Sequence, residues 1–392
     1  MSYWQSEQLF QTGDQYYQAL FNSWSRARRS IDFEVYIFEP GQLAKRVESE
    51  LMKAAQRGVD VRLIVDGMGS TSWVRSESPR LLNESGAQVR VFNPFLTAEI
   101  FSQIFKGLIP MWEVLRPAFK ARRNPFIRRL NRRTHRKLSI VDGENAFVGS
   151  INVADDHLET YSGRRAWRDS AVSVTGPATA LLEESFQYHW RRSVRAPFKA
   201  RVRIPFQFRR KRPKGLTAPI GFTHRFHLRT QHRRRVMQTI QDQYVRIWIA
   251  NPYLAPPSGV VRKLVRAAQR GVDVRVLIPQ HSDVWFMPLI AQAYYRNLMK
   301  GGVRIFEYTP SFLHAKIMIF DSVALLGTSN LNRRSFLHDS EVDLWLNQPA
   351  TLEKLVADFH LDIENSVEVC VPPGWWVSRI GRILNYLIRY WV

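Results

Sequence analysis

The feature that most constrains the fold is an internal repeat. The nonapeptide AAQRGVDVR occurs at Ala54–Arg62 and again at Ala267–Arg275. In each copy a helical pattern ends at the glycine and an apolar, strand-like run begins. A repeat over such a distance favours two similar domains. With 392 residues the chain is also too long for one typical core.

Further segments extend the repeat and indicate the fold class. The run SIDFEVYIFEP at Ser30–Pro40 corresponds to YVRIWIANPYLAPP at Tyr244–Pro257. The run SGAQVRVFNP, which begins at Ser85, corresponds to KGGVRIFEYTP, which begins at Lys300. Because strands alternate with helical segments in both copies, the sequence predicts α/β units with a largely parallel or mixed sheet.

The two halves differ in length. Phe92 and Phe306 are 214 residues apart, yet His135 and His314 are only 179 apart. The first half therefore carries an insertion of about 35 residues, predicted at about 96–133, which is aromatic at first and then basic. We expect a first lobe at 1–190, a basic linker at 191–220, a second lobe at 221–370 and an amphipathic tail at 371–392.

A polar motif recurs inside this repeat. THRKLSIVDGENAFVGSIN at 134–152 and LHAKIMIFDSVALLGTSN at 313–330 share a histidine, a lysine and an aspartate at equal spacing. Both then contain a glycine, a hydroxyl residue and an asparagine at equal spacing, and this second group lies one residue nearer to the aspartate in the second copy. Chance could explain one copy, but not two copies within an independently detected repeat. The matched residues are His135, Lys137, Asp142, Ser150 and Asn152 in the first copy and His314, Lys316, Asp321, Thr328 and Asn330 in the second.

The residue types in this motif suit phosphate chemistry. Residues two apart in a strand point to the same face, so each histidine projects together with its lysine. Two lobes packed face to face would bring both sets into one pocket. The lysines would neutralise phosphate oxygens, while the asparagines and hydroxyls would donate hydrogen bonds. One imidazole could attack phosphorus while the other protonates the leaving alkoxide.

Acidic residues near each motif have two predicted roles. Asp169 and Glu341 are candidates to orient the histidines and fix their tautomers, and Asp339 competes with Glu341 because both would face the same side of a strand. Asp142 and Asp321 complete the motifs, but their position at strand ends favours a structural role. No metal or other cofactor is expected, since the lysines supply positive charge and the histidines lack zinc-ligand spacing.

The charge of the chain indicates a polyanionic partner. A net charge of +23 suits either nucleic acid or an anionic membrane. The C-terminal segment GWWVSRIGRILNYLIRYWV mixes arginine with aromatic residues, which is typical of a membrane-interface helix and favours the membrane. Because no apolar run is long enough to cross a bilayer and the N-terminus does not resemble a signal peptide, we expect peripheral binding. The single cysteine, Cys370, excludes an internal disulfide framework.

The two motifs resemble the paired HKD motifs of the phospholipase D superfamily, and the resemblance covers nearly the whole chain. AAQRGVDVRLIVDGMGS and SNLNRRSFLHDSEV are closest to bacterial cardiolipin synthases of the short type without N-terminal transmembrane helices. The resemblance implies two α/β/α sandwich lobes with pseudo-two-fold symmetry and the active site between them. It also implies phosphatidyl transfer between two phosphatidylglycerols through a phosphohistidine, with release of glycerol. The resemblance further implies that His135 is the nucleophile and that His314 acts first as the general acid and then as the general base.

The leading hypothesis is therefore a cardiolipin synthase bound to an anionic phospholipid membrane that contains phosphatidylglycerol and cardiolipin. We expect it on the cytoplasmic face of the bacterial inner membrane, with no nucleic-acid partner and no obligatory protein partner. One alternative is a phospholipase D-type phosphodiesterase, either a phospholipid hydrolase or a nuclease. Another is a non-catalytic lipid-binding scaffold, against which the two intact motifs argue.

Overall fold

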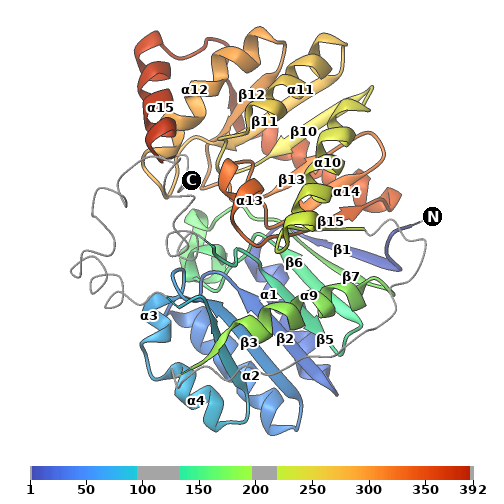
Figure 1. Cartoon of the computed structure of the whole chain (residues 1–392), viewed down its shortest axis with the longest axis vertical. Helices are drawn as coiled ribbons and strands as arrows, with labels where there is room; N and C mark the ends of the chain where they lie inside the picture. The colour runs from blue at the N-terminus through green and yellow to red at the C-terminus, as the bar shows by residue number, and fades with distance from the viewer. Residues whose placement is uncertain (1, 95–131, 197–218, 389–392) are drawn as a thin grey trace.

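The computed structural model describes residues 2–94, 132–196 and 219–388. Most of the predicted insertion and of the predicted basic linker lies outside these residues. The described chain forms two lobes, with the N-terminal lobe below and the C-terminal lobe above in Figure 1. Each lobe is built on a mixed sheet in which eight strands are described.

The first sheet has the strand order β1-β7-β6-β5-β2-β3-β4-β8. Strands β2, β3 and β4 run parallel, while β5, β6 and β7 pair antiparallel. β5 joins the two sets because it pairs antiparallel with β2. The bounds are β1 Ser6–Phe10, β2 Ser30–Val35, β3 Asp60–Asp66, β4 Gln88–Phe92, β5 Leu138–Val141, β6 Asn145–Gly149, β7 Ala171–Thr175 and β8 Val194–Arg195.

The second sheet repeats the first, strand for strand. Its order is β16-β12-β11-β10-β13-β14-β15-β9, so each strand corresponds to the one numbered eight lower. The predicted α/β fold with two similar lobes is therefore confirmed. The bounds are β9 Ile220–Phe222, β10 Arg246–Ala250, β11 Asp273–Pro279, β12 Arg304–Tyr308, β13 Ile317–Ile319, β14 Ala324–Gly327, β15 Val342–Leu346 and β16 Ser366–Glu368.

Helices cover both faces of each sheet. In α2 the buried residues Leu43, Val47, Leu51 and Ala54 recur at helical spacing, which gives the helix one apolar face to pack on the sheet. In the first lobe the helices are α1 Gly13–Arg26, α2 Gln42–Gln56, α3 Thr71–Val74, α4 Ser78–Glu84, η2 Asp155–His157, α8 Glu159–Ser162, η3 Gly163–Arg165 and α9 Thr179–Arg192. In the second lobe they are α10 Phe226–Gln241, α11 Ser258–Gln269, α12 Met287–Lys300, α13 Arg333–Leu337, α14 Pro349–Glu364 and α15 Trp375–Ile388.

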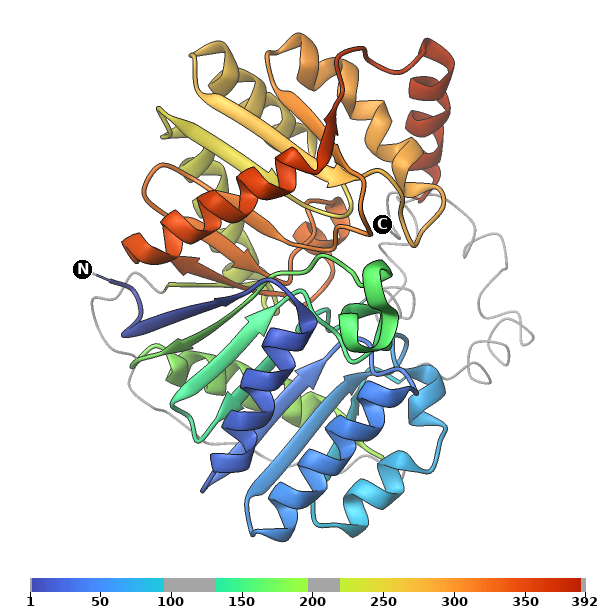
Figure 2. The same cartoon turned by 180° about the vertical axis from the view of Figure 1, so that it is seen from behind.

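The arrangement of the helices follows the pseudo-two-fold symmetry. α9 lies toward the viewer in the first lobe in Figure 1, whereas α14 lies toward the viewer in the second lobe in Figure 2. Because β8 belongs to the first sheet and β9 to the second, we propose that the chain passes from one lobe to the other between residues 195 and 220.

The two lobes share one apolar core. Ile140 and Val148 of the first sheet belong to the same buried cluster as Leu326 and Leu344 of the second. Helices α9 and α14 each add buried side chains to this cluster. The lobes are also joined by a bidentate ion pair between Arg168 and Asp362, with a shortest distance of 2.9 Å. The surfaces that face each other are therefore packed as an interior rather than loosely apposed.

The aspartates of the two motifs hold sheet ends together. Asp142 accepts hydrogen bonds from the backbone N–H groups of residues 28–30, which lead into β2. Asp321 does the same for residues 244–246, which lead into β10. Asp142 lies seven residues beyond His135 along an extended chain, which corresponds to roughly 20 Å. The structure thus places both aspartates away from the histidines.

This role predicts a stability effect for Asp142→Asn. The residue has a φ of 54°, which asparagine tolerates, so the substitution removes the charge with little backbone strain. Burial raises the pKa of Asp142, but the backbone hydrogen bonds outweigh it and the pKa lies below its usual 3.8. The stabilisation is therefore present above pH 3.8 and is lost as the pH falls through the lower, folded-state pKa. We expect a loss of about 1 kcal/mol in unfolding free energy at pH 7, which thermal melts would detect.

Melts at successively lower pH supply the control, because the wild-type carboxylate becomes protonated as the pH falls through its folded-state pKa, and the two proteins should converge there. An Asp142→Asn protein that unfolds like wild type at pH 7 would contradict this role.

Candidate active site

Each motif histidine lies on a backbone bridge between the lobes. The N–H of His135 donates to the carbonyl of Ser340 at 2.9 Å, and the N–H of His314 donates to the carbonyl of Arg168 at 2.8 Å. These bonds belong to parallel bridges that pair Thr134 with Ser340 and Leu313 with Arg168. Each histidine therefore lies beside the residue that precedes the other lobe's candidate carboxylate.

The histidine–carboxylate pairs cross from lobe to lobe. Nδ1 of His135 lies 3.1 Å from Glu341 Oε2 and 3.0 Å from the carbonyl of Thr328. Because both partners accept hydrogen bonds, this nitrogen carries the hydrogen. Nδ1 of His314 lies 2.7 Å from Asp169 Oδ1. Both carboxylates named from the sequence thus contact a histidine, each from the opposite lobe.

Asp339, the competing carboxylate, faces a different partner. Its Oδ2 accepts a hydrogen bond from Nε of Arg334 at 2.7 Å. Glu341 rather than Asp339 is therefore the carboxylate that contacts the imidazole of His135.

The motif hydroxyls support the carboxylates. Oγ of Ser150 donates to Asp169 Oδ1 at 2.7 Å, and Oγ1 of Thr328 donates to Glu341 Oε2 at 2.6 Å. The glycine before Ser150 is required by close approach, because a Cβ on Gly149 would lie 2.4 Å from the Cβ of Ala171. Ser150 and Thr328, which were predicted to bind phosphate, therefore donate hydrogen bonds to the carboxylates that orient the histidines.

The two motif asparagines are buried, with different surroundings. Oδ1 of Asn152 accepts a hydrogen bond from the N–H of Ile37 at 3.2 Å. Oδ1 of Asn330 has no hydrogen-bond partner within the described part of the chain. The asparagines thus lie in the site, and the second has an acceptor free for a bound group.

Both motif lysines are buried against the histidines. Nζ of Lys137 donates to the carbonyl of His135 at 2.8 Å and lies 5.2 Å from the centre of the Tyr36 ring. Nζ of Lys316 lies 2.9 Å from both the carbonyl and Nε2 of His314. The second imidazole therefore already has a proton donor at its outer nitrogen.

The charges of the two lobes act on one another. Burial, followed by the charges of Lys137 and Lys316, lowers the pKa of His135 well below its usual value. Burial and then Lys316 likewise lower the pKa of His314. Both imidazoles are therefore neutral near pH 7, as a nucleophile or a base must be. Because Lys316 acts on His135, the two half-sites form a single electrostatic site.

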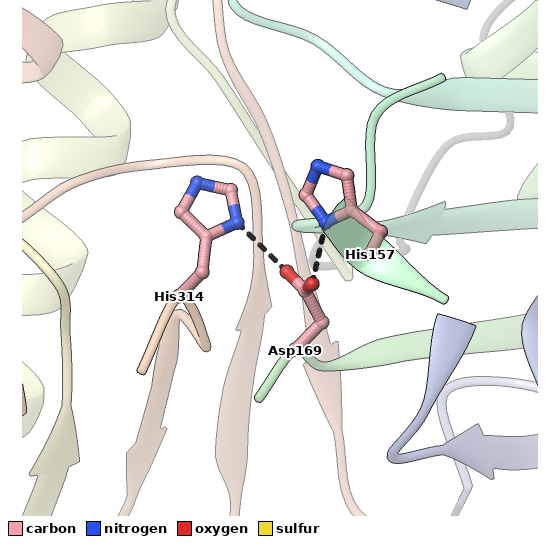
Figure 3. Close-up of side chains that lie close together, drawn as sticks. All are labelled: His157, Asp169 and His314. Carbon is pink, nitrogen blue, oxygen red and sulfur yellow. Dashed lines mark hydrogen bonds and ion pairs between the residues drawn. The ribbon is translucent and has the colours of Figure 1, made fainter. Parts of the chain in front are cut away.

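A further histidine, His157, shares the carboxylate of Asp169. Its Nδ1 lies 2.6 Å from Asp169 Oδ2, and Figure 3 shows the carboxylate between the imidazoles of His157 and His314. Its Nε2 accepts a hydrogen bond from the N–H of Asn152 at 3.4 Å. Sequence reasoning missed this residue, because only the paired motifs themselves were compared.

The repeat contained a signal that would have found it. Ser335 lies five residues after Asn330, as His157 lies five residues after Asn152. Oγ of Ser335 donates to Glu341 Oε1 at 2.6 Å and accepts from the N–H of Asn330 at 3.1 Å. Histidine and serine thus make the same pair of contacts in the two halves.

Within the described residues, His157, Asp169 and His314 form a group whose ligand atoms lie within 4.8 Å of one another. This donor set does not fit a metal ion well. Both Nδ1 atoms are engaged by the carboxylate between them, and Nζ of Lys316 lies 2.9 Å from the remaining ring nitrogen of His314.

Comparison with known proteins gives the family. The model described as "Cardiolipin synthase, PLD-like domain" matches residues 20–106 and 236–363, where PLD stands for phospholipase D. The chain belongs to this family. Cardiolipin synthase 2 of Bacillus anthracis is 30% identical over 366 residues, which cover 92% of this chain and 65% of that protein. A cardiolipin synthase of Clostridium perfringens is 26% identical over 97% of this chain and 75% of that protein. The chain thus spans slightly less than two thirds of the Bacillus cardiolipin synthase.

Two solved structures share the fold of this chain. Phosphatidylserine synthase from Haemophilus influenzae superposes with a TM-score of 0.68 at 12% identity, covering 98% of this chain and 94% of that chain. Polyphosphate kinase from Porphyromonas gingivalis has a TM-score of 0.55 at 12% identity, with 97% and 55% covered. These structures agree with the two-lobed fold, and the family model confirms the resemblance to the phospholipase D superfamily.

The contacts of His157 predict unequal effects of two substitutions. His157→Ala leaves a buried oxygen of Asp169 without its donor, and should lower the unfolding free energy by about 1–3 kcal/mol in chemical denaturation. His157→Ser should cost less, because Ser335 makes the equivalent contacts in the other half. Ser335→Ala is the matched control and should resemble His157→Ala. Equal losses for His157→Ser and His157→Ala would show that the serine cannot replace the histidine.

Proposed function

We propose that the chain is a cardiolipin synthase, which transfers the phosphatidyl group of one phosphatidylglycerol to another and releases glycerol. The crossed pairs of His135 with Glu341 and of His314 with Asp169 are the observation that carries the proposal. Two oriented, neutral imidazoles beside two buried lysines are the groups that a double displacement at phosphorus requires. The family and the printed names of the relatives supply the lipid substrate class.

In the first step, His135 is the proposed nucleophile. Its Nδ1 is held by Glu341, and its Nε2 has no hydrogen-bond partner among the described residues, whereas Nε2 of His314 contacts Lys316. Nε2 of His135 attacks phosphorus, and the bond from phosphorus to the glycerol oxygen breaks. His314 donates the proton to the leaving oxygen. Burial and then the charge of Lys316 lower the pKa of His314, and a bound phosphate anion counteracts both, so that this imidazole can carry the proton.

In the second step, the second phosphatidylglycerol supplies a hydroxyl. His314, now neutral, takes the hydroxyl proton while the oxygen attacks the phosphohistidine. The phosphorus–nitrogen bond breaks, and its electron pair returns to His135. Lys137 and Lys316 neutralise the phosphate oxygens in both steps, and Asp169 stabilises the imidazolium form of His314.

The orientation of α15 supports action at a membrane surface. The helix docks on α12 through small and polar residues: a Cβ on Gly381 would lie 2.0 Å from the carbonyl of Leu289, and Nδ2 of Asn385 donates to the Tyr294 hydroxyl at 2.8 Å. Trp376, Ile380 and Ile383, spaced four and three residues apart, form the opposite stripe and are 69%, 49% and 52% exposed. The helix therefore turns its apolar stripe away from the protein, which marks an interaction surface.

The charge of this helix favours anionic lipid as the partner. Arg379 lies 5.1 Å from the centre of the Trp375 ring, and both residues are exposed beside the apolar stripe. The sequence of α15 contains no acidic residue. Tryptophan and arginine around an apolar stripe suit the headgroup region of an anionic membrane. We propose that α15 rests on such a membrane, on the cytoplasmic face in bacteria.

Of the helices that the structure describes, none combines the length and the apolar character needed to span a bilayer.

Incubation of the protein with phosphatidylglycerol vesicles tests the proposed activity. We expect cardiolipin and glycerol in equal amounts, measured by thin-layer chromatography and a glycerol assay. His135→Ala and His314→Ala should each lower turnover by roughly a thousandfold or more, because each removes a group that takes part in both steps. Phosphatidic acid as the main product would support a hydrolase instead. Cleavage of DNA or RNA without lipid turnover would support a nuclease.

Sedimentation with phosphatidylglycerol vesicles tests the role of α15. The triple substitution Trp376→Ser, Ile380→Ser and Ile383→Ser should weaken binding by roughly tenfold or more, since it removes most of the exposed apolar stripe. Leu361→Ser is the matched control, because Leu361 is an exposed apolar residue on α14. Unchanged binding by the triple variant would overturn the membrane role of the helix.

A further inference from the structure

The two half-sites differ in the residues that surround each histidine. Two residues before each carboxylate lie Trp167 in the first lobe and Asp339 in the second. Two residues before each histidine lie Arg133 in the first motif and Phe312 in the second. Because each histidine meets the carboxylate of the opposite lobe, Trp167 and Phe312 gather around His314. Arg133 and Asp339, the charged residues at the matching positions, belong to the half-site of His135.

Contacts confirm this difference in chemistry. The ring centres of Trp167 and Phe312 lie 5.0 Å and 5.8 Å from that of His314, and 4.8 Å from one another. Both rings are half-buried. In the other half-site, Asp339 pairs with Arg334 at 2.7 Å, and Arg133 lies 3.6 Å from Asp66. His314 thus has beside it an aromatic wall of two rings of its own half-site, whereas His135 has the single ring of Tyr36, at 4.9 Å, and a network of ion pairs.

The aromatic wall continues toward the proposed membrane surface. The ring of Tyr253 lies 6.2 Å from that of Phe312. Tyr253 and Phe286 pack on one small apolar cluster, which Leu384 of α15 also contacts. Trp285 is 76% exposed, and its ring lies 5.5 Å from that of Phe286. We call Trp167, Phe312, Tyr253, Phe286 and Trp285 the aromatic path; it reaches from His314 to the edge where α12 and α15 lie side by side (Figure 1).

We propose that the aromatic path binds the acceptor lipid, with its glycerol hydroxyl at His314 and its acyl portion directed toward α15. This inference rests on the proposed function and names the subsite that the second substrate occupies. Aromatic rings offer apolar contact to glycerol carbons and acyl chains. The ion pairs around the other histidine would have to be desolvated to accept an acyl portion, at considerable cost.

The path also favours transfer over hydrolysis. In the second step an oxygen attacks the phosphorus of the phosphohistidine, its proton passes to His314, and the phosphorus–nitrogen bond breaks with its electron pair returning to His135. A lipid hydroxyl in this position yields cardiolipin, whereas water in the same position yields phosphatidic acid. Rings beside His314 strengthen binding of the lipid and displace water. The ratio of the two products therefore reports how well the acceptor site is filled.

The first arm of the test measures this ratio. The full chain is incubated with radiolabelled phosphatidylglycerol vesicles, and cardiolipin and phosphatidic acid are quantified. Phe312→Ala should raise the ratio of phosphatidic acid to cardiolipin by roughly fivefold or more, because it removes apolar contact beside His314. Phe226→Ala, an exposed aromatic residue on α10 away from the path, is the control and should leave the ratio unchanged.

The second arm separates a lipid acceptor from a free polyol. Labelled free glycerol is added to the phosphatidylglycerol vesicles as a competing acceptor, and its incorporation into phosphatidylglycerol is measured beside cardiolipin formation. Trp285→Ala should lower cardiolipin formation more than glycerol incorporation, because the exposed distal ring can contact only the acyl portion. Since Trp285 is largely exposed, this variant should fold even if Phe312→Ala does not.

The possible outcomes are distinct. A parallel fall of both products in Phe312→Ala, with an unchanged ratio, would overturn the acceptor assignment and leave the transferase proposal intact. An equal effect of Trp285→Ala on both acceptors would overturn the extension toward α15. A wild-type protein that forms no cardiolipin would contradict the proposed function itself.

Discussion

The rest of the structure depends on two backbone hydrogen bonds that cross between the lobes. His135 donates to the carbonyl of Ser340, and His314 donates to that of Arg168. Because the next residue in each case is the carboxylate, the main chain itself brings Glu341 and Asp169 to the imidazoles. Each motif histidine is paired with the carboxylate of the opposite lobe, so docking of the lobes and assembly of the site are the same event.

Docking also makes the burial of so many charges tolerable. An unpaired charge in an interior costs several kcal/mol, yet Lys137, Lys316, Asp169 and Glu341 are all buried. Their partners come from both lobes, and the shared apolar core keeps these partners in place. The same burial lowers the pKa of His135 and His314, so that the neutral imidazoles that the proposed mechanism needs follow from the packing.

Pseudo-symmetry is kept in the framework and lost around the histidines. The sheets correspond strand for strand, and each carboxylate accepts from a motif hydroxyl and from one further donor, His157 or Ser335. The rings of Trp167 and Phe312 have charged residues as their counterparts in the other half. The proposed exchange of one phosphatidyl group between two lipids uses a donor position and an acceptor position, and these differences make the two positions unequal without disturbing the support of either histidine.

Much of this was accessible from local sequence. The repeat and its alternating pattern predicted two α/β lobes, because helix and strand periods are properties of neighbouring residues. Equal spacing identified both histidines and lysines. Asp169 and Glu341 were identified without equal spacing, as acidic residues that follow each motif along the chain. His157 was missed although its counterpart Ser335 lies at the same offset from the motif asparagine.

By itself, the sequence determined the lobes, the polar groups of the site and an amphipathic C-terminal helix. Only the tertiary structure decided that each histidine meets the other lobe's carboxylate, across 145 and 206 residues of chain. It also decided that α15 docks through Gly381 and Asn385 and leaves Trp376 exposed. The physical reason is the same in both cases. Periodicity shows which residues share a face, but the face that meets a neighbour is chosen by the fit between two complete surfaces.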